Sequence, residues 1–476
     1  MSDRQLRCLI LIFLFVGNMS CRKFLDVEVS GSKIEAKKVF KDNTTATNTL
    51  LGIYGGMHNA DASPARLARS TGLSGDELML TWTSDMEAIY KNMLAPNNVI
   101  GTNLWTAGYY YIRVANEVYW GCYSSETLDP AIKKQLMAEA LFIRAYWFFY
   151  LTNLYGDIPI TVTTDVNVTA LLSRTAQRDV YQQIIADLML AQTDIDEHYK
   201  GVNSKDNSDE RVRPNRATVS ALLARVYLYT ENYAEAEQQA SAIIAMNDTY
   251  TLVALDQVFL KNSKETIWQL MPGTPNTAKI NTTEGNEFII TQSLKTDGQQ
   301  AISSSLLKAF EVGDQRRKRW ISTYTDSGVS PAVTYYFPYK YKVKSGEDIK
   351  EYSMIFRLAE IYLIRAECEA HLGQLSDALA DLNKIRQRAG LAAIPEGVLN
   401  KDQLLNTIFR ERQVELFTEQ CHRWFDLKRT GKVEVVMATE TPAKGGGAWN
   451  ASKQLWPIPS SEISRAPNLV QNPGYQ

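Results

Sequence analysis

Residues that could bind a metal for catalysis are few in this sequence. The chain has four histidines, and they are scattered rather than clustered. Cys368-x-x-His371 and Glu419-x-x-His422 each supply two side chains at helical spacing. A closed zinc or di-iron site needs further ligands, which neither pair has beside it in the sequence. We therefore interpret both pairs as ordinary helix surface and predict no metal and no cofactor.

Other catalytic patterns give no stronger signal. The sequence contains no Gly-x-Ser-x-Gly elbow, and the glycine run Gly445–Gly447 is followed by Ala and Trp rather than by Lys and Ser. Asp85 and Glu87 have the residue types of a glycoside-hydrolysing pair, but two acids this close in sequence are common. The sequence predicts a protein that is not an enzyme, with glycoside hydrolysis as the weakest of the alternatives.

Residues suited to binding gather in two stretches, Thr71–Tyr111 and Thr249–Ser345, that lack a sustained helical period. Irregular segments on a rigid scaffold commonly carry binding sites. Aromatic rings stack on the apolar faces of sugars, and carboxylates accept hydrogen bonds from hydroxyls. The alternative is that each ring is a local core plug, the commoner role of such a residue. The predicted ligand-binding residues are Asp76, Trp82, Asp85, Tyr90, Trp105, Trp320, Tyr335 and Tyr336.

The first twenty residues have the character of a secretory signal peptide. Two arginines precede the apolar run Cys8–Val16, which is too short to cross a bilayer. Cys21 follows directly, and acylation of its thiol would hold the chain at a membrane, because each buried methylene contributes about 0.8 kcal/mol. Asn18 and Met19 differ from the residues usual before such a cysteine. Plain cleavage beside an unmodified Cys21 is therefore the alternative.

Composition limits the class of protein. The chain has 476 residues, 45% of them hydrophobic, so it can bury a large core without disulfides. Beyond Cys21 it carries only Cys122, Cys368 and Cys421, an odd number without framework spacing. The formal net charge is −2, and basic clusters such as Arg316–Arg319 are short. We expect no nucleic-acid partner.

Helical periodicity dominates the scaffold that must position these residues. In Ala131–Tyr155 the apolar residues recur every three or four positions, and Gly156 and Pro159 end the pattern. Arg216–Thr230 and Tyr233–Ala245 read as a helical hairpin with a short link.

The same hairpin pattern returns 142 residues later: Ala224, Tyr233, Ala236 and Ile243 correspond to Ala366, Leu375, Ala378 and Ile385. Small alanines fit where two helices approach closely, as in tetratricopeptide units. Val180–Ala191 and Gln403–Phe417 are predicted to contribute to two further helix pairs. The expected fold is mostly α: a tetratricopeptide-like helical-repeat scaffold whose long irregular insertions carry the ligand site.

Ordered blocks along the chain resemble one family. They are Phe24–Asp26, Arg144–Leu151 with Leu154–Pro159, Arg357–Leu363, Glu411–Arg429, and Leu455–Pro459 with Gln471–Tyr475. In this order they resemble the SusD/RagB-type nutrient-binding lipoproteins of Bacteroidota outer membranes. The resemblance implies an acylated Cys21, capture of an oligosaccharide or other nutrient, and delivery to a SusC-like TonB-dependent transporter.

The resemblance also sets expected boundaries: a signal peptide over 1–20, an N-terminal region over 21–230, a repeat helix with an aromatic-rich insertion over 231–345, and a C-terminal region over 346–476. Arg22 and Lys23 stand where surface-displayed relatives often carry acids. Asp26 and Glu28 partly replace that acidic run, so display at the cell surface stays the first expectation. The alternative is a periplasm-facing scaffold that binds a protein or peptide partner in its helical groove.

One charged pattern has two interpretations. Arg412, Glu415, Glu419, Arg423 and Asp426 recur at three and four residues, which on a single helix makes one charged stripe. From the residues alone this stripe reads as a solvated face. With the family resemblance, it is interpreted as ion pairs that tie the last helix to the scaffold. Neither interpretation is catalytic.

Overall fold

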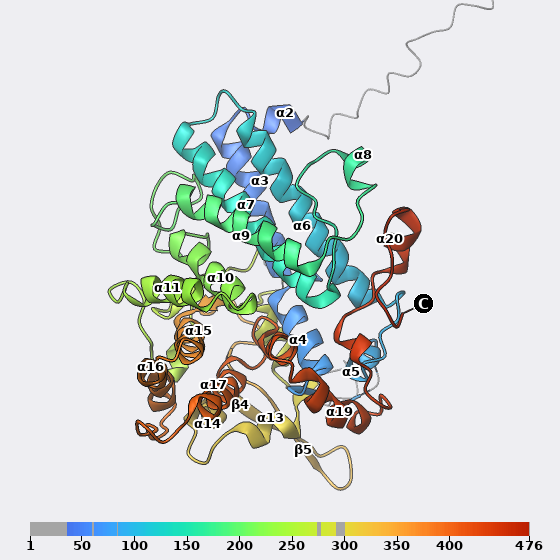
Figure 1. Cartoon of the computed structure of the whole chain (residues 1–476), viewed down its shortest axis with the longest axis vertical. Coiled ribbons are helices and arrows are strands. Elements are labelled where there is room, and N and C mark those ends of the chain that lie inside the picture. The colour runs from blue at the N-terminus through green and yellow to red at the C-terminus, as the bar shows by residue number, and fades with distance from the viewer. Residues whose placement is uncertain (1–35, 60, 83, 274–277, 292–299, 476) are drawn as a thin grey trace, which may run out of the picture.

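The computed structural model describes residues 36–59, 61–82, 84–273, 278–291 and 300–475, so the predicted signal segment and Cys21 lie outside it. The fold is mostly helical, as predicted (Figure 1). Within the described residues, no helix is long and apolar enough to cross a membrane. The helices are α2 Ala36–Val39, α3 Asn43–Asn59, α4 Pro64–Ser74, α5 Glu87–Tyr90, α6 Val99–Tyr123, α7 Pro130–Tyr155, α8 Val166–Thr169, α9 Gln177–Asp194, α10 Arg216–Tyr229, α11 Tyr233–Ile244, α12 Thr283–Phe288, α13 Ser304–Ala309, α14 Gln315–Arg319, α15 Leu358–His371, α16 Leu375–Arg388, α17 Lys401–Leu416, α18 His422–Arg429, α19 Val433–Ala443 and α20 Ser460–Arg465. The strands are β1 Leu78–Leu80, β2 Thr266–Leu270, β3 Gln300–Ile302, β4 Ile321–Asp326, β5 Val333–Pro338 and β6 Ser353–Arg357.

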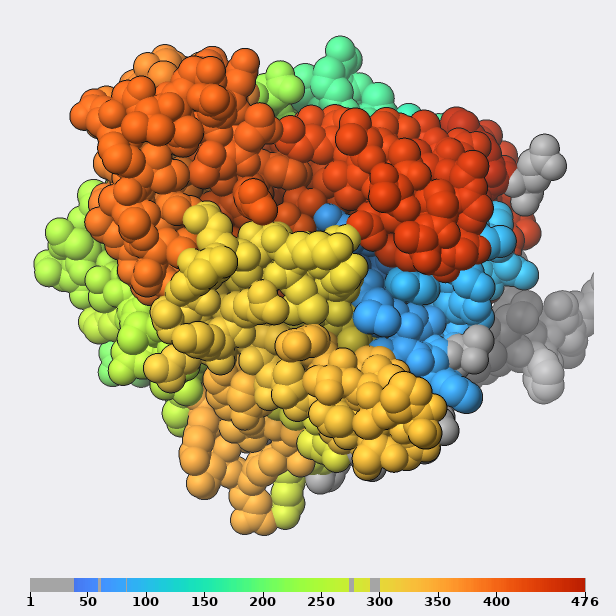
Figure 2. All heavy atoms as spheres, turned by 90° about the horizontal axis from the view of Figure 1, so that it is seen from below, coloured from blue at the N-terminus to red at the C-terminus, as the bar shows by residue number. Residues whose placement is uncertain are grey.

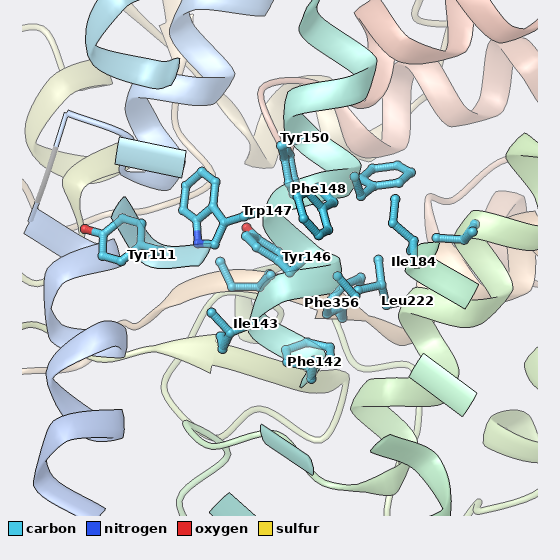
Figure 3. Close-up of a cluster of buried hydrophobic side chains, with 14 of the residues drawn as sticks. Tyr111, Phe142, Ile143, Tyr146, Trp147, Phe148, Tyr150, Ile184, Leu222 and Phe356 are labelled. Atoms are coloured by element: carbon cyan, nitrogen blue, oxygen red, sulfur yellow. The ribbon is translucent and has the colours of Figure 1, made fainter. Parts of the chain in front are cut away.

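The helix α7 is the centre of the N-terminal half. Asp129 caps its start, and Gly156, with φ 76°, ends it, which confirms the helix predicted over Ala131–Tyr155. Helices α6 and α9 pack along α7, and α3 contacts both α6 and α7. Every residue from Ala138 to Tyr155 is therefore buried. Figure 3 shows its aromatic side chains meeting residues of neighbouring elements, among them Tyr111, Ile184 and Leu222.

Two helical hairpins form the repeat. Helices α10 and α11 are joined by residues 230–232, and α15 and α16 by residues 372–374. Helix α11 packs against α15, and α17 packs against α15 and α16 (Figure 1). Ala224, Ala236, Ala366 and Ala378 are all fully buried, because small side chains let the paired helices approach closely. The predicted repeat is confirmed.

Six short strands in the described residues form three antiparallel pairs, β1–β3, β2–β6 and β4–β5. They correct the prediction that Thr249–Ser345 is irregular, since this stretch contains β2 to β5, three short α-helices and one 3-10 helix. The prediction for Thr71–Tyr111 was also wrong at its end, because α6 already begins at Val99. Strands of three to six residues are too short to show a clear two-residue period.

The three described cysteines, Cys122, Cys368 and Cys421, are buried and form no disulfide. Burial raises the pKa of the Cys122 and Cys421 thiols to about 12. They behave as small apolar side chains rather than as nucleophiles.

The C-terminal segment closes over the end of α7. The backbone N–H of Trp456 donates to the carbonyl oxygen of Leu154 at 2.8 Å. The side-chain amide of Asn472 donates to the carbonyl oxygens of Tyr155 and Trp456 at 2.8 and 2.7 Å. Carbonyls at a helix end have no partner within the helix, so this segment satisfies them from outside.

Candidate ligand-binding face

Two of the predicted residues, Trp82 and Asp85, are exposed in the loop after β1. Trp82 is 48% exposed, an unusual state for an indole. Strand β1 pairs with β3, and β3 lies beside β5. The loop and the hairpin β4–β5 therefore share one surface, which we call the loop face. Figure 2 shows it, with blue residues beside the yellow and orange residues of the insertion.

Tyr335 and Tyr336 are consecutive residues of β5 and point to opposite sides of the hairpin, as successive residues of a strand do. Tyr335 packs near the buried residues Ile289 and Phe337, whereas Tyr336 packs against the cluster around Trp320. Both rings are partly exposed. They cannot form a single flat platform, so only one of them can face a given ligand.

Tyr90, the last residue of α5, is half-buried at the rim of the loop face. The ammonium group of Lys444 lies 5.4 Å from the centre of its ring and donates to the carbonyl oxygens of residues 73–75, where α4 ends. A cation is favoured at a helix C-terminus. Gly446 lies against the backbone of Lys91, where a Cβ would come within 2.0 Å of the carbonyl oxygen. The glycine run Gly445–Gly447 therefore lets its backbone pack closely against that of Lys91.

Asp76 was predicted as a ligand residue, and its placement contradicts this. It is 3% exposed, and its carboxylate accepts two hydrogen bonds from Arg423, at 2.8 and 2.6 Å. This bidentate pair joins α18 to the segment between α4 and β1. The Asp76 carboxylate therefore holds the segment beneath the loop face in place and is not itself on that surface.

The neighbouring carboxyl, Glu77, is also buried and receives only long hydrogen bonds, 3.3 and 3.4 Å, from the backbone N–H of Thr418. Burial and the nearby charge of Asp76 raise the pKa of Glu77 to about 8. The group is therefore protonated in the folded protein at neutral pH.

This raised pKa predicts a pH-dependent stability. Between pH 4.5 and about 8 the unfolded chain loses a proton from Glu77 that the folded protein keeps. Stability therefore falls as the pH rises through this window, at up to about 1.4 kcal/mol per pH unit from this group. Urea unfolding at pH 5.5, 7 and 8.5 measures the slope. Glu77→Gln, which is neutral and keeps an acceptor for Thr418, should flatten the slope; an unchanged slope would assign the dependence to other groups.

Trp105 and Trp320 were also predicted as ligand platforms, and both predictions are wrong. Trp105 lies in α6, is 3% exposed and packs its ring edge-on against Tyr155 at 5.0 Å between ring centres. Trp320 is fully buried, and its indole N–H donates to the carbonyl oxygen of Leu255 at 3.0 Å. Neither ring has a face open to a ligand.

A buried ion cluster lies beneath the hairpin and the repeat. The guanidinium of Arg357 donates to Glu419 at 2.7 Å, to Glu415 at 2.6 Å and to Glu265 at 3.0 Å. The ammonium group of Lys340 pairs with Glu419. Burial alone would raise the pKa of Glu415, but the surrounding arginines hold it well below its usual range. We call Arg357, Lys340, Glu265, Glu415 and Glu419 the ion cluster.

Glu415 and Glu419 of the charged pattern belong to the ion cluster, and its other residues form further buried pairs. The ion-pair interpretation is therefore confirmed and the solvated face is wrong. Arg412 pairs with Asp426 at 2.7 Å, and both side chains are buried. The expectation of one continuous helix is corrected: α17 ends at Leu416 and α18 begins at His422. Between them Thr418, Gln420 and Cys421 adopt left-handed conformations, which turn the chain.

Sequence reasoning did not predict two hollows in the repeat and linker regions. One cavity of about 620 Å³ is lined by residues around Tyr199 and Arg211, and another of about 550 Å³ by residues around Tyr233 and His371. The helical pattern marks these segments as scaffold and gives no sign of a cavity between them. Within the described part of the chain, no group of three or more His, Cys, Asp or Glu side chains is placed to hold a metal ion.

The fold is a helical-repeat scaffold that carries an exposed face built on inserted loops. Comparison with known families gives its class. The model of the SusD family matches residues 193–475, and a model described as "Starch-binding associating with outer membrane" matches residues 23–228. The chain belongs to the SusD family.

Individual relatives agree over almost the whole length. SusD-like protein P2 of Formosa agariphila is 26% identical, over 92% of this chain and 93% of the relative. The crystal structure of a SusD superfamily protein from Bacteroides vulgatus superposes with a TM-score of 0.78 at 20% identity, over 92% of this chain and 100% of that one. The crystal structure of a SusD-like carbohydrate binding protein from Bacteroides vulgatus superposes with a TM-score of 0.75 at 21% identity. The match covers 90% of this chain and 97% of that one. At these identities the two structures establish the fold.

Proposed function

We propose that this protein is a surface-displayed outer-membrane lipoprotein, anchored through an acylated Cys21, that binds an oligosaccharide and delivers it unchanged to a SusC-like TonB-dependent transporter. Membership of the SusD family supports the partner and the anchor. The observation that carries the binding role is the half-exposed Trp82 beside the exposed Asp85 on the loop face. An exposed indole and a carboxylate in the same loop supply the ring face and the hydrogen-bond acceptor that sugar recognition uses.

The proposed binding mode is stacking with a polar rim. The ring of Trp82 covers the apolar face of a sugar, and the carboxylate of Asp85 accepts hydrogen bonds from its hydroxyls. Tyr90 and one of the two hairpin tyrosines, Tyr335 or Tyr336, border the same surface. Asp76, Trp105 and Trp320 act below it, because their buried contacts hold the loops in place.

Trp82→Ala is expected to weaken oligosaccharide binding about tenfold, because a ring stacked on a sugar contributes on the order of 1 kcal/mol beyond its burial. A glycan array with the purified protein identifies the oligosaccharide, and titration calorimetry compares the variants. Trp120→Ala is the matched control, since Trp120 is 41% exposed on α6, away from the loop face. Equal losses in the two variants, or none in Trp82→Ala, would remove Trp82 from the site.

The same preparations test the rest of the proposal. Chromatography of the bound oligosaccharide after long incubation should show no shortened product, because the proposal is binding and delivery without hydrolysis. Affinity purification from detergent-solubilised outer membranes should recover a transporter with this protein. Recovery of the protein alone would contradict the delivery step.

A further inference from the structure

A groove of about 550 Å³ lies in the repeat half of the molecule, where the hairpin α10–α11 meets α15, α17 and α18. Its volume is within the range of small-molecule sites, roughly 300–1,000 Å³. It shares no element with the loop face, which is built from β1, α5 and the hairpin β4–β5. The groove is lined by Tyr233, Glu367, His371, Asp402, Phe409 and Arg429 among others.

Two aromatic rings form part of the groove wall. Tyr233 begins α11 and His371 ends α15, and their rings stack with 4.0 Å between centres and 5° between planes. Both side chains are only partly buried. Burial lowers the pKa of His371, which keeps its ring neutral at neutral pH. The inner faces of the two rings cover each other, so a sugar would stack with its apolar face on the outer face of this uncharged pair.

The charges of the groove are mostly satisfied within its own wall. The guanidinium of Arg429 pairs with Glu367 at 2.6 Å and with Asp426 at 2.7 Å. Lys432 donates to the side-chain oxygen of Asn406 at 3.0 Å. These cations are therefore already engaged and offer little to an anionic ligand.

Two hydrogen-bond acceptors remain. The carboxylates of Glu231 and Asp402 line the groove and are exposed. Neither makes a hydrogen bond or an ion pair with any residue that the structure describes. Carboxylates accept hydrogen bonds readily, and sugar hydroxyls are donors that fit them.

We infer that this groove binds one neutral pyranose unit, which stacks on the Tyr233–His371 pair and donates hydroxyl hydrogen bonds to Glu231 and Asp402. The inference rests on the proposed function, because it takes the same class of ligand. It adds a second sugar site on the repeat scaffold, remote in structure from the loop face.

The test measures the binding of small probes, each of which can occupy only one site at a time. The probes are methyl α-glucopyranoside, methyl β-galactopyranoside and methyl α-mannopyranoside. Their binding to the purified protein is measured by saturation-transfer NMR titration. In a Trp82→Ala background at least one glycoside should still bind. Adding Tyr233→Ala or Asp402→Asn should weaken that binding about three- to tenfold. Tyr362→Ala is the control, because Tyr362 is a half-buried tyrosine of α15 outside the groove.

Asp402→Asn changes an exposed side chain in the first turn of α17, so it also tests the site should Tyr233→Ala fold poorly. Loss of all glycoside binding in Trp82→Ala, or unchanged binding in both groove variants, would overturn the inference and leave the proposed function standing. Failure of the proposed function has a separate signature, which is that the glycan array shows no oligosaccharide binding.

Discussion

Arg357→Met is expected to lower the free energy of unfolding by about 3–5 kcal/mol, because it removes the cation at the centre of the ion cluster. Arg357 is 1% exposed and contacts three carboxylates, those of Glu265, Glu415 and Glu419. Without the guanidinium these acids stay buried with less compensation and must take up protons or repel one another. Urea unfolding at neutral pH measures the loss.

Two variants sharpen this test. Arg319→Met removes an exposed arginine whose guanidinium lies 2.9 Å from the carboxylate of Asp256. This variant should change the free energy of unfolding by less than about 1 kcal/mol, because the pair is exposed. Arg357→Lys keeps the charge but not the planar fork, so its loss should lie between the other two. If Arg357→Met were no more destabilising than Arg319→Met, the cluster would contribute nothing beyond surface pairing.

Trp268→Ala should cost about 3–5 kcal/mol of unfolding free energy, as large aromatic deletions in a core do. Trp268 in β2 is fully buried, and its ring lies 5.1 Å from Phe142 of α7 and 6.1 Å each from Tyr54 of α3 and Phe356 of β6, centre to centre. Its indole N–H donates to the carbonyl oxygen of Val212 at 3.1 Å. The ring therefore joins the helical bundle to the β2–β6 pair.

The same unfolding experiment separates this role from that of an exposed indole. Trp82→Ala, at 48% exposure, should change stability by less than about 1 kcal/mol. Cooperative unfolding of Trp268→Ala at the wild-type urea midpoint would mean that neighbouring side chains fill the cavity, contrary to the close packing seen around it.

The scaffold was predictable because its signal is local. A helix such as α7 repeats its apolar spacing over seven turns and ends at Gly156, so period and cap agree. The two hairpins carry alanines at matching positions, which marks the helix crossings. The short strands and the first half of α6 were missed because three to six residues, or a helix rich in Thr, Asn and Gly, give a weak pattern.

The candidate site was only partly predictable because exposure depends on distant partners. Trp82 and Trp320 are the same residue type and both lie in the predicted binding stretches, yet one is half exposed and the other is buried against Phe417 and Leu255. Asp76 reads as a loop acid until Arg423, 347 residues away, is placed beside it. No spacing rule within a segment reveals such a pairing.

The closure of the C-terminal segment over α7 has a consequence for how the protein is made. The contact between Asn472 and Tyr155 joins residues 317 apart. At roughly 5–20 residues per second, a ribosome needs roughly 15–60 s to synthesise the intervening chain. During that time the carbonyl oxygens of Leu154 and Tyr155 lack the donors that Trp456 and Asn472 later supply. We expect the last turn of α7 to stay frayed until the last residues of the chain have been added and folded.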